Sequence, residues 1–369
     1  MELGVAGNSL SLQEVSALSV FPLPKAAASR RTVQATFEFS QPGSWNETDR
    51  DEYLKEEIFP QIAPPPYGRV TSEKLSDQKP VYLFCEDTQN IAVVGKVWKH
   101  GLLSVDEAWT LAEREYFNLL LAREMLGMDS GRHRVVAPLG KSKELSALLV
   151  TERAPGSTLD HYIAGAVYES ETERLFSKLS DLAGFLAKLH GNSQTNKQVS
   201  LEVSAWYLCT LLDCLSGQIL SPLERDNLNE TAARWWHEHS IFEEDRQVMV
   251  HGDATPCNFL FQDQGVIAID LEKMHWADRC WDLGFVAAEL KHHFMWRKGD
   301  GWAAEPFIGH FLWEYAVNYG DTQFFHVITG KVPLYMALGL LRIARNPWLD
   351  GAHRRNLLKE AEGCLRYGL

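Results

Sequence analysis

Basic residues are scarce in this 369-residue chain: 36 Lys and Arg stand against 49 Asp and Glu, for a formal net charge of -13 at pH 7. Nucleic acids and anionic membrane surfaces attract proteins with an excess of Lys and Arg, so neither is expected as a partner. No apolar run approaches the ~20 residues of a membrane-spanning helix. The start, Met1-Glu2-Leu3, lacks the basic region of a secretory signal, and Glu14 argues against an organellar transit peptide.

Cysteine is sparse as well. The six cysteines show no C-x-x-C pair and no spacing typical of a disulfide framework, so they are predicted to be reduced thiols in a cytoplasmic protein. The pairs His237-x-His239 and His292-His293 have no third ligand at a spacing that suits zinc, and we interpret them as surface or core residues. With 45% hydrophobic and 23% charged residues and no internal repeat, the chain is typical of a soluble globular protein, with two or three domains or two lobes of one large unit.

The most informative stretch runs from Val248 to Asp282. It opens with a short apolar run that ends abruptly at His251-Gly252-Asp253. Two further apolar runs follow, on either side of Asp263-Gln264-Gly265, which is typical of a three-residue hairpin turn with glycine at the left-handed position. The two predicted strands of this hairpin are Phe259–Phe261 and Val266–Ile269.

The open end of this hairpin carries side chains suited to phosphate chemistry. A hairpin centred on Gln264 places Asn258 and Asp270 opposite each other. An amide oxygen and a carboxylate on neighbouring strands suit a magnesium ion, which takes oxygen ligands and leaves room for phosphate. Asp253, on the loop just upstream, is then placed to accept a proton from an attacking hydroxyl.

These residues also carry a resemblance. His251-x-Asp253-x4-Asn258 followed by Asp270-x-Glu272 resembles the catalytic signature of the aminoglycoside phosphotransferase and choline kinase superfamily, whose order of base and metal ligands follows the logic of phosphoryl transfer. The resemblance implies an α+β fold that is bilobal and protein-kinase-like, with a small antiparallel β lobe holding one long helix and a large, mainly helical lobe. The alternative is a chance His-Gly-Asp turn before an unrelated hairpin.

The resemblance also implies a role for each of these positions. Asp253 is the catalytic base, Asn258 and Asp270 bind Mg²⁺, and Glu272 binds a second ion or its waters. Two residues support the catalytic loop: His251, and Asp282 in Trp281-Asp282-Leu283-Gly284, whose carboxylate in this family anchors the loop through backbone N–H groups. His190, at the end of a long helix, is expected to pack against or hydrogen-bond the same loop.

The segment from Gly68 onward has the pattern of a small β lobe, with predicted strands at Gly68–Glu73, Pro80–Glu86, Ile91–Trp98, Arg134–Leu139 and Ala147–Thr151. Lys96 is a lone cation inside one apolar strand, so it needs a carboxylate or phosphate partner. The alternative is an edge-strand lysine that faces water. By resemblance, Lys96 contacts the α- and β-phosphates and pairs with a glutamate of the next helix. We choose Glu115 for this pair, with Glu113 as a competitor.

That helix, Ser104–Met125, has Ser104 as its N-cap and Glu107 completing a capping box. The loop Lys74–Lys79, which covers the phosphates in a kinase fold, contains no glycine, and by resemblance Ser76 contacts a phosphate there. The resemblance further assigns the adenine contacts to the Glu152 carbonyl and the Ala154 N–H, at a hinge where Ser157 or Thr158 can cap the following helix.

The large lobe is predicted to be mainly helical. Its expected helices are Glu171–His190, Leu201–Leu215, Pro222–His239, Leu283–Trp296, Glu305–Tyr319, Thr322–Thr329, Pro333–Arg345 and Gly351–Tyr367. The predicted domains are therefore a small nucleotide-binding lobe at 68–151 and a large catalytic and acceptor-binding lobe at 152–369. Residues 1–67, with one strand candidate at Val33–Phe39, form an N-terminal extension of unknown role.

The sequence thus predicts an ATP- and Mg²⁺-dependent phosphotransferase acting on a hydroxyl of a small molecule. A nucleotide-binding pseudokinase without turnover stays open because of the glycine-free loop. A protein kinase is disfavoured, since no activation segment lies between Asp270 and Asp282. From Leu201 to Val250 nine acids stand against three bases, and several tryptophans follow, among them Trp276, Trp281, Trp296, Trp302 and Trp313. These features predict an amine-bearing or cationic acceptor, although tryptophans also fill cores and acids also cover solvated faces.

Overall fold

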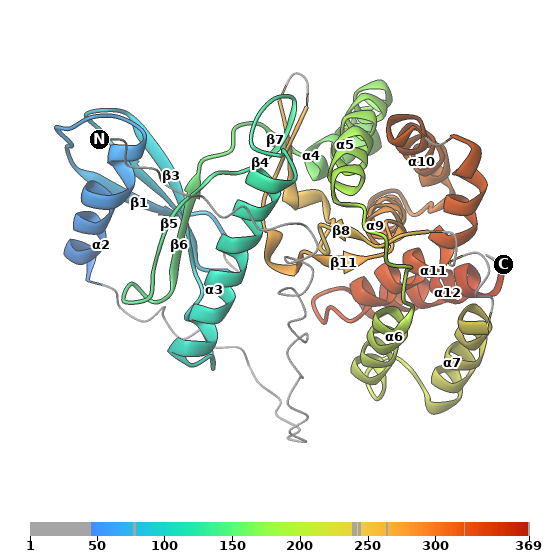
Figure 1. Cartoon of the computed structure of the whole chain (residues 1–369). Coiled ribbons are helices and arrows are strands. Elements are labelled where there is room, and N and C mark those ends of the chain that lie inside the picture. The colour runs from blue at the N-terminus through green and yellow to red at the C-terminus, as the bar shows by residue number, and fades with distance from the viewer. Residues whose placement is uncertain are drawn as a thin grey trace. The chain divides into compact units, whose positions relative to one another are not determined.

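The computed structural model describes residues 46–76, 79–237, 242, 245–262, 265–320 and 322–367. All of them belong to one compact unit that runs from Pro42 to Leu369 (Figure 1). The strand expected at Val33–Phe39 and the hairpin residues Asp263 and Gln264 lie outside the described residues.

The unit begins with a small lobe of strands and helical turns. Its elements are α2 (Glu47–Tyr53), the π-helical turn η1 (Leu54–Ile58), the 3-10 turn η2 (Phe59–Gln61), β1 (Val70–Lys74), β2 (Val81–Glu86), β3 (Ile91–Val97), α3 (Val105–Leu120), the π-helical turn η3 (Leu121–Met125), β4 (His133–Val135), β5 (Pro138–Ser142) and β6 (Leu148–Glu152).

A mostly helical large lobe follows. Its elements are β7 (Ser157–Thr158), α4 (Leu159–Tyr168), α5 (Thr172–Ser193), α6 (Glu202–Leu215), α7 (Pro222–His237), β8 (Val248–Val250), η4 (Pro256–Asn258), β9 (Phe259–Phe261), β10 (Val266–Ala268), η5 (Leu271–Lys273), β11 (His275–Ala277), α9 (Cys280–Lys298), η6 (Trp302–Ala304), α10 (Glu305–Tyr319), η7 (Thr322–Phe324), α11 (Phe325–Ala344) and α12 (Gly351–Tyr367).

Five strands of the small lobe form one antiparallel sheet in the order β1-β2-β3-β6-β5 (Figure 1). The number of strands is as predicted, but the prediction of one continuous strand at Arg134–Leu139 is wrong. Its first half is β4, which pairs parallel with β10 in a separate sheet of order β4-β10-β9-β7, and the fifth strand of the small lobe starts only at Pro138. The run looks continuous because both halves are apolar, yet its backbone hydrogen bonds are divided between two sheets.

Strand β3 is central in this sheet, because it pairs with β2 on one side and β6 on the other. Its side chains alternate between the two faces. Val93 and Val97 are buried in the small-lobe core, whereas Lys96 lies on the opposite face, where its side chain is 15% exposed and meets α3. The water-facing edge position considered for Lys96 is therefore ruled out.

The segment before β1 supplies part of the same core. Leu54, Ile58 and Phe59, from η1 and η2, are fully buried. They cluster with Phe84 and Val93 of the sheet. Burying a large apolar side chain contributes about 1.5–3 kcal/mol, so the described part of the N-terminal segment stabilises the sheet that carries Lys96.

Helix α3 has the start that its sequence predicts. The Ser104 hydroxyl accepts the backbone N–H of Glu107, and the Glu107 carboxylate accepts the N–H of Ser104, which completes the capping box. Val105, the first residue of the helix, is 44% exposed. Farther along, Asn118 donates to the Leu271 carbonyl at 2.7 Å, which ties α3 to the segment after the hairpin.

The hairpin itself is shifted by one residue from its predicted register. Ala268 pairs with Phe259, and the N–H of Ile269 donates to the carbonyl of Asn258 at 3.0 Å. Asn258 therefore faces Ile269, and the prediction that it faces Asp270 is wrong. The second strand ends at Ala268, and Asp270 adopts the left-handed conformation (φ 61°, ψ 55°), which aspartate tolerates better than most residues.

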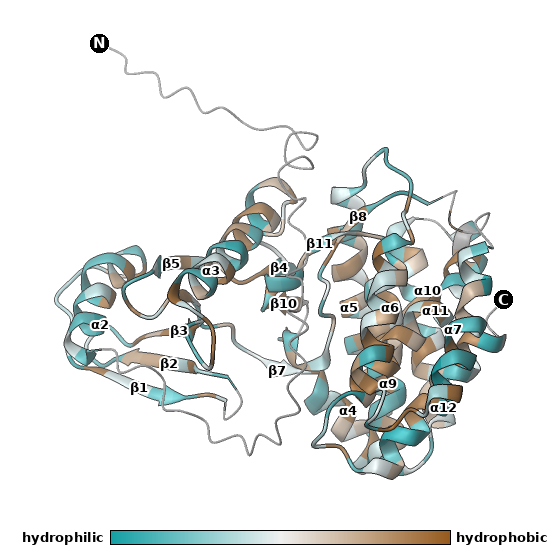
Figure 2. Ribbon diagram, turned by 90° about the horizontal axis from the view of Figure 1, so that it is seen from below, coloured by the Kyte–Doolittle hydropathy of each residue, from teal (hydrophilic) through white to brown (hydrophobic). Residues whose placement is uncertain are grey.

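Helix α11 runs unbroken from Phe325 to Ala344 with Pro333 inside it, so the two helices predicted on either side of that proline are one. By length and hydropathy this is the one helix among the described residues that is able to cross a membrane, but 78% of its apolar window is buried. It packs between α9 and α12. Helix α12 carries both hydrophilic and hydrophobic residues (Figure 2), with Leu357, Ala361 and Leu365 buried at helical spacing, as expected of an outer helix.

All six cysteines lie among the described residues, and none of them forms a disulfide. Cys280 is buried, whereas Cys257, on the loop before the hairpin, is exposed. The fold is therefore held together without covalent cross-links between the described cysteines.

Candidate active site

The loop from His251 to Asn258 is anchored from below by Asp282 at the start of α9. The Asp282 carboxylate accepts the backbone N–H of His251 at 2.7 Å and that of Gly252 at 3.0 Å. It also contacts His190 Nε2 at 3.1 Å, and His190 Nδ1 lies 2.9 Å from the Tyr315 hydroxyl. Burial disfavours the charge on Asp282, but its hydrogen bonds with His190 and the loop outweigh burial and hold the pKa below its usual range. The predicted backbone anchoring by Asp282 is present.

The loop is also fixed along its length. His251 Nε2 lies 3.0 Å from the carbonyl of Ile269, at the end of β10, and the Asn258 amide donates to the Asp253 carbonyl at 2.9 Å. Gly252 has φ +79°, and a Cβ there would lie 2.1 Å from the Lys273 carbonyl. Only glycine fits this close approach of two backbone segments.

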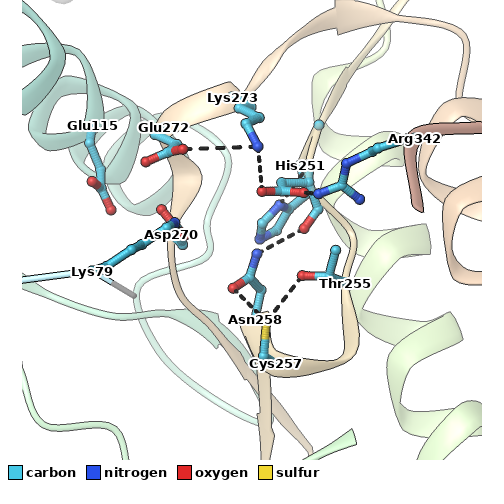
Figure 3. A network of polar contacts seen from close by, with 12 residues as sticks. Lys79, Glu115, His251, Thr255, Cys257, Asn258, Asp270, Glu272, Lys273 and Arg342 are labelled. Carbon is cyan, nitrogen blue, oxygen red and sulfur yellow. Dashed lines mark hydrogen bonds and ion pairs between the residues drawn. The ribbon is translucent and has the colours of Figure 1, made fainter. Parts of the chain in front are cut away.

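Two cations, Lys273 and Arg342 (Figure 3), hold the side chain of Asp253. Its Oδ2 lies 2.7 Å from Lys273 Nζ, and its Oδ1 accepts from the Arg342 guanidinium. Only 6% of the side chain is exposed. Burial favours the neutral acid, but Arg342 and then Lys273 lower the pKa of Asp253 below its usual value, so the carboxylate is ionised at neutral pH.

Sequence reasoning missed both of these cations. Lys273 stands three positions after Asp270 in the chain, and this proximity was the available signal. Arg342 is 89 residues away from Asp253, but it is a lone cation in the apolar run Leu340-Leu341-Arg342-Ile343. Like Lys96, a cation among apolar residues needs a carboxylate or phosphate partner.

A second cluster gathers around Lys96. Its Nζ lies 2.9 Å from Glu115, 2.6 Å from Asp270 and 2.6 Å from Glu272. Lys79, from the loop before β2, adds a contact of 3.1 Å to the other oxygen of Asp270. Burial disfavours charged Lys96, but the three carboxylates outweigh it and raise the pKa of Lys96.

The competition between the two glutamates of α3 is thereby decided. Glu115 is buried and pairs with Lys96, whereas Glu113 pairs with Lys141 of β5 on a more exposed part of the helix. Burial raises the pKa of Glu115 to about 7, against the attraction of Lys96. Three carboxylates that share this small volume repel one another, and protonation of the most deeply buried one relieves that repulsion.

Ligand atoms of Glu115, Asp270 and Glu272 lie within 4.8 Å of one another, so these side chains can hold a divalent ion. Hard carboxylate oxygens suit Mg²⁺. Asn258, also predicted as a ligand, offers its Oδ1 as a further oxygen donor, and this atom accepts a contact from Cys257 Sγ at 3.6 Å. The donor set of Asn258, Asp270 and Glu272 fits magnesium chemically.

The other predicted nucleotide contacts lie outside the cluster around Lys96. The Ser76 hydroxyl accepts the N–H of Lys79 at 3.2 Å, within its own loop. The Glu152 carboxylate pairs with Arg134 and accepts the N–H of Ala137, beside the hinge that also contains Ala154. Thr158 occupies the N-cap position of α4 but makes no side-chain capping bond, and it pairs with Leu260 of β9.

The acids and tryptophans behind the acceptor prediction are scattered. Asp245 is buried with Lys331, Asp213 pairs with Arg225, and Trp302 is 78% exposed. Trp281 is buried and stacks on Phe285, with a ring distance of 5.2 Å. Tyr207 lies 5.4 Å from the Trp281 ring. The Arg342 guanidinium lies 5.5 Å from the Phe285 ring. Trp281 and Phe285 are both buried, so these two rings belong to the core.

The small antiparallel lobe with one long helix, the helical lobe and the loops that join them define a protein-kinase-like fold. The model of the phosphotransferase enzyme family matches residues 112–317, which are 206 of the 369 residues. The chain therefore belongs to the phosphotransferase enzyme family. Among curated proteins, no sequence matches this chain.

Solved structures show the same fold at low sequence identity. The choline kinase LicA from Streptococcus pneumoniae is 17% identical, with a TM-score of 0.50, over 86% of this chain and 99% of its own. An ethanolamine kinase from Plasmodium vivax is 12% identical, with a TM-score of 0.55, over 86% and 89%. APH(2″)-IIa in a ternary complex with streptomycin and ATP is 12% identical, with a TM-score of 0.52, over 86% and 97%.

Proposed function

We propose that this protein is an ATP- and Mg²⁺-dependent phosphotransferase that moves the γ-phosphoryl group to a hydroxyl of a small molecule. One observation carries the proposal. A buried, ionised Asp253 and the carboxylates Asp270 and Glu272 lie on one segment, from His251 to Asp282, in the order that phosphoryl transfer requires, and Lys96 contacts both Asp270 and Glu272 from β3. Membership of the phosphotransferase enzyme family and the ATP in a structural neighbour support the nucleotide donor.

Each side chain has a task that follows from its position. Lys96, fixed by Glu115, neutralises charge on the nucleotide phosphates, with Ser76 and Lys79 on the loop that covers them. The backbone at Glu152 and Ala154 contacts the adenine. Asn258, Asp270 and Glu272 hold magnesium, which supplies charge neutralisation and alignment of the phosphates when bound.

The acceptor is activated by Asp253. Its carboxylate orients the hydroxyl through a hydrogen bond and takes the proton as the new O–P bond forms. Asp282 and His251 keep the loop in place, so Asp253 does not have to be reorganised during the reaction.

For the acceptor, we propose an amine-bearing or cationic alcohol whose charge lies well away from the reacting hydroxyl. Acids outnumber bases by nine to three between Leu201 and Val250, and this excess supports a cationic ligand. Arg342 and Lys273, however, flank the base itself. A second positive charge about 5 Å from either of them costs on the order of 3 kcal/mol at an effective dielectric constant of 20, which disfavours a short amino alcohol.

The test is release of ADP from ATP and Mg²⁺ by the purified protein, with a panel of short amino alcohols, aminoglycosides, neutral polyols and carboxylated sugars. We expect large polyamine alcohols to stimulate ADP release most strongly. Stimulation by neutral polyols or carboxylated sugars alone would reject the cationic acceptor but keep the phosphotransferase.

The alternative of a nucleotide-binding module without turnover makes a different prediction in the same assay. The protein would then bind ATP but release no ADP with any acceptor or with water. Asp253, Asn258 and Asp270 are all present, whereas a pseudokinase usually lacks one of these groups, which favours the enzyme.

A further inference from the structure

The carboxylate of Asp253 is shared between two cations. An ionised carboxylate has about four acceptor sites, two on each oxygen. Lys273 takes one site on Oδ2 and Arg342 takes one on Oδ1, which leaves one site on each oxygen for an acceptor hydroxyl. The two cations therefore set the plane in which the remaining lone pairs point.

Arg342 is the more rigid of the two. Its side chain is 14% exposed, and a second nitrogen of its guanidinium lies 3.6 Å from Glu289 of α9. The guanidinium is planar and presents its donors in a fixed fork, so a change in its orientation would disturb the contacts to both carboxylates. Glu289 itself is only 12% exposed.

Lys273 lacks this support. Its side chain is 41% exposed, and its other ion pair, with Glu272, is long at 4.0 Å. A flexible lysine stem with a single close contact fixes a carboxylate less well than a buried guanidinium held at two points. The orientation of Asp253 therefore depends mainly on the packing of α9 against α11, far along the chain from the catalytic loop.

We propose that Arg342 is a positioning residue of the phosphotransferase, which holds the Asp253 carboxylate so that its free lone pairs face the acceptor hydroxyl. This role rests on the proposed function of Asp253 as the group that orients the acceptor. It assigns catalytic importance to α11, a helix that the family signature of the loop and hairpin does not include.

A double-mutant cycle tests the proposal. ADP release from ATP and Mg²⁺, with water as the acceptor, is measured for the wild type, Arg342→Gln, Asp253→Asn and the double variant. We expect Arg342→Gln to lower kcat by roughly 10–100-fold with an unchanged KM for ATP, as for a misplaced catalytic group. In the Asp253→Asn background the same substitution should have no further effect, because its target is missing.

Equal factors in the two backgrounds would show a role that does not pass through Asp253, and no effect in the wild type would also overturn the proposal. Arg345→Gln is the matched control: this arginine follows the end of α11 and forms no ion pair with a described carboxylate, so its kcat should equal that of the wild type. If Arg342→Gln fails to fold, Arg342→Lys takes its place in the cycle.

A second measurement does not depend on activity. In crystals of the wild type the Asp253 carboxylate should occupy one orientation, and in Arg342→Gln it should turn toward Lys273 or take two orientations. An unchanged carboxylate would overturn the positioning role. If the wild type releases no ADP with water or with any acceptor of the panel, the proposed function fails, while the crystal structures still decide whether Arg342 orients Asp253.

Discussion

Asp253 is the residue whose replacement should be most informative. We expect Asp253→Asn to lower turnover by roughly 10²–10⁴-fold, the usual scale for a positioned general base, and to leave nucleotide affinity near that of the wild type. The asparagine keeps the size of the side chain, so the loop held by Asp282 should persist. The measurement is steady-state ADP release together with calorimetric titration of ADP. Full activity of this variant with a confirmed acceptor would remove Asp253 from the base role.

At the scale of residues, the sequence predicts that a charged side chain within an apolar run has a partner of opposite charge. Lys96 was found because a lone cation in an apolar strand needs a partner, and its pair with Glu115 is present. Arg342 is also a cation within an apolar run, but its partner Asp253 is 89 residues away and was not predicted. The need for a partner can be read from local sequence, but the identity of a distant partner cannot.

At the scale of elements, the hairpin makes a prediction about metal binding. Asp270→Ala should weaken Mg²⁺-dependent nucleotide binding, because a charged ligand is lost. It also places alanine at a left-handed position (φ 61°), which costs about 1–2 kcal/mol. Asp270→Asn is the comparison that separates the two effects, since asparagine tolerates this conformation. ADP is titrated with and without Mg²⁺, and the same Mg²⁺ dependence in wild type and Asp270→Ala would exclude Asp270 as a ligand.

The loop before β2 makes a prediction about phosphate binding. It has no glycine to bring its backbone close to phosphate, but Lys79 reaches Asp270 from it at 3.1 Å with a side chain 49% exposed. We expect Lys79→Gln to weaken ADP binding by up to about five-fold, the scale of an exposed ion pair, and to leave adenosine binding unchanged. Lys74→Gln is the control, because Lys74 is exposed at the end of β1 and lies on the same loop. Equal affinities for ADP in all three proteins would exclude Lys79 from phosphate binding.

At the scale of the whole molecule, stability depends on a buried ionic cluster. Lys331 of α11 has no exposed surface and lies 2.5 Å from Asp245 and 2.8 Å from Asp278, with Arg279 at 2.9 Å from Asp245. Lys331→Met leaves Asp278 without its cationic partner and Asp245 with Arg279 alone, so we expect a loss of about 3–5 kcal/mol in the free energy of unfolding. Urea unfolding measures it, and Lys359→Met, at an exposed site on α12, should change stability by less than about 0.5 kcal/mol.

The same cluster gives a pH dependence with a defined sign. Burial opposes the charge on Asp245, but Lys331 and Arg279 outweigh burial and lower its pKa. A depressed pKa contributes stability above the unfolded value of about 3.9 and loses it as the pH falls through the folded value. The pKa of Lys331 is raised, so its contribution persists up to at least about pH 10. The difference between wild type and Lys331→Met should therefore be constant from about pH 5 to 9 and shrink below about pH 4, and a difference that grows in acid would contradict this assignment.

The sequence by itself determined the features that depend on near neighbours. These are the capping box of α3, the helical periodicity of the large lobe, the glycine of the hairpin turn and the order of Asp253, Asn258 and Asp270. Each rests on residues a few positions apart, where backbone geometry and side-chain pattern suffice.

Only the tertiary structure decided which distant groups meet. It divided one apolar run between β4 and β5, kept α11 continuous through Pro333, and shifted the hairpin by one residue. Each of these outcomes depends on hydrogen bonds or packing supplied by another part of the chain, such as the pairing of β10 with β4. Arg342 is a further example. A local pattern shows that a buried charge needs a partner, but only the packing of α9 against α11 brings Arg342 to Asp253.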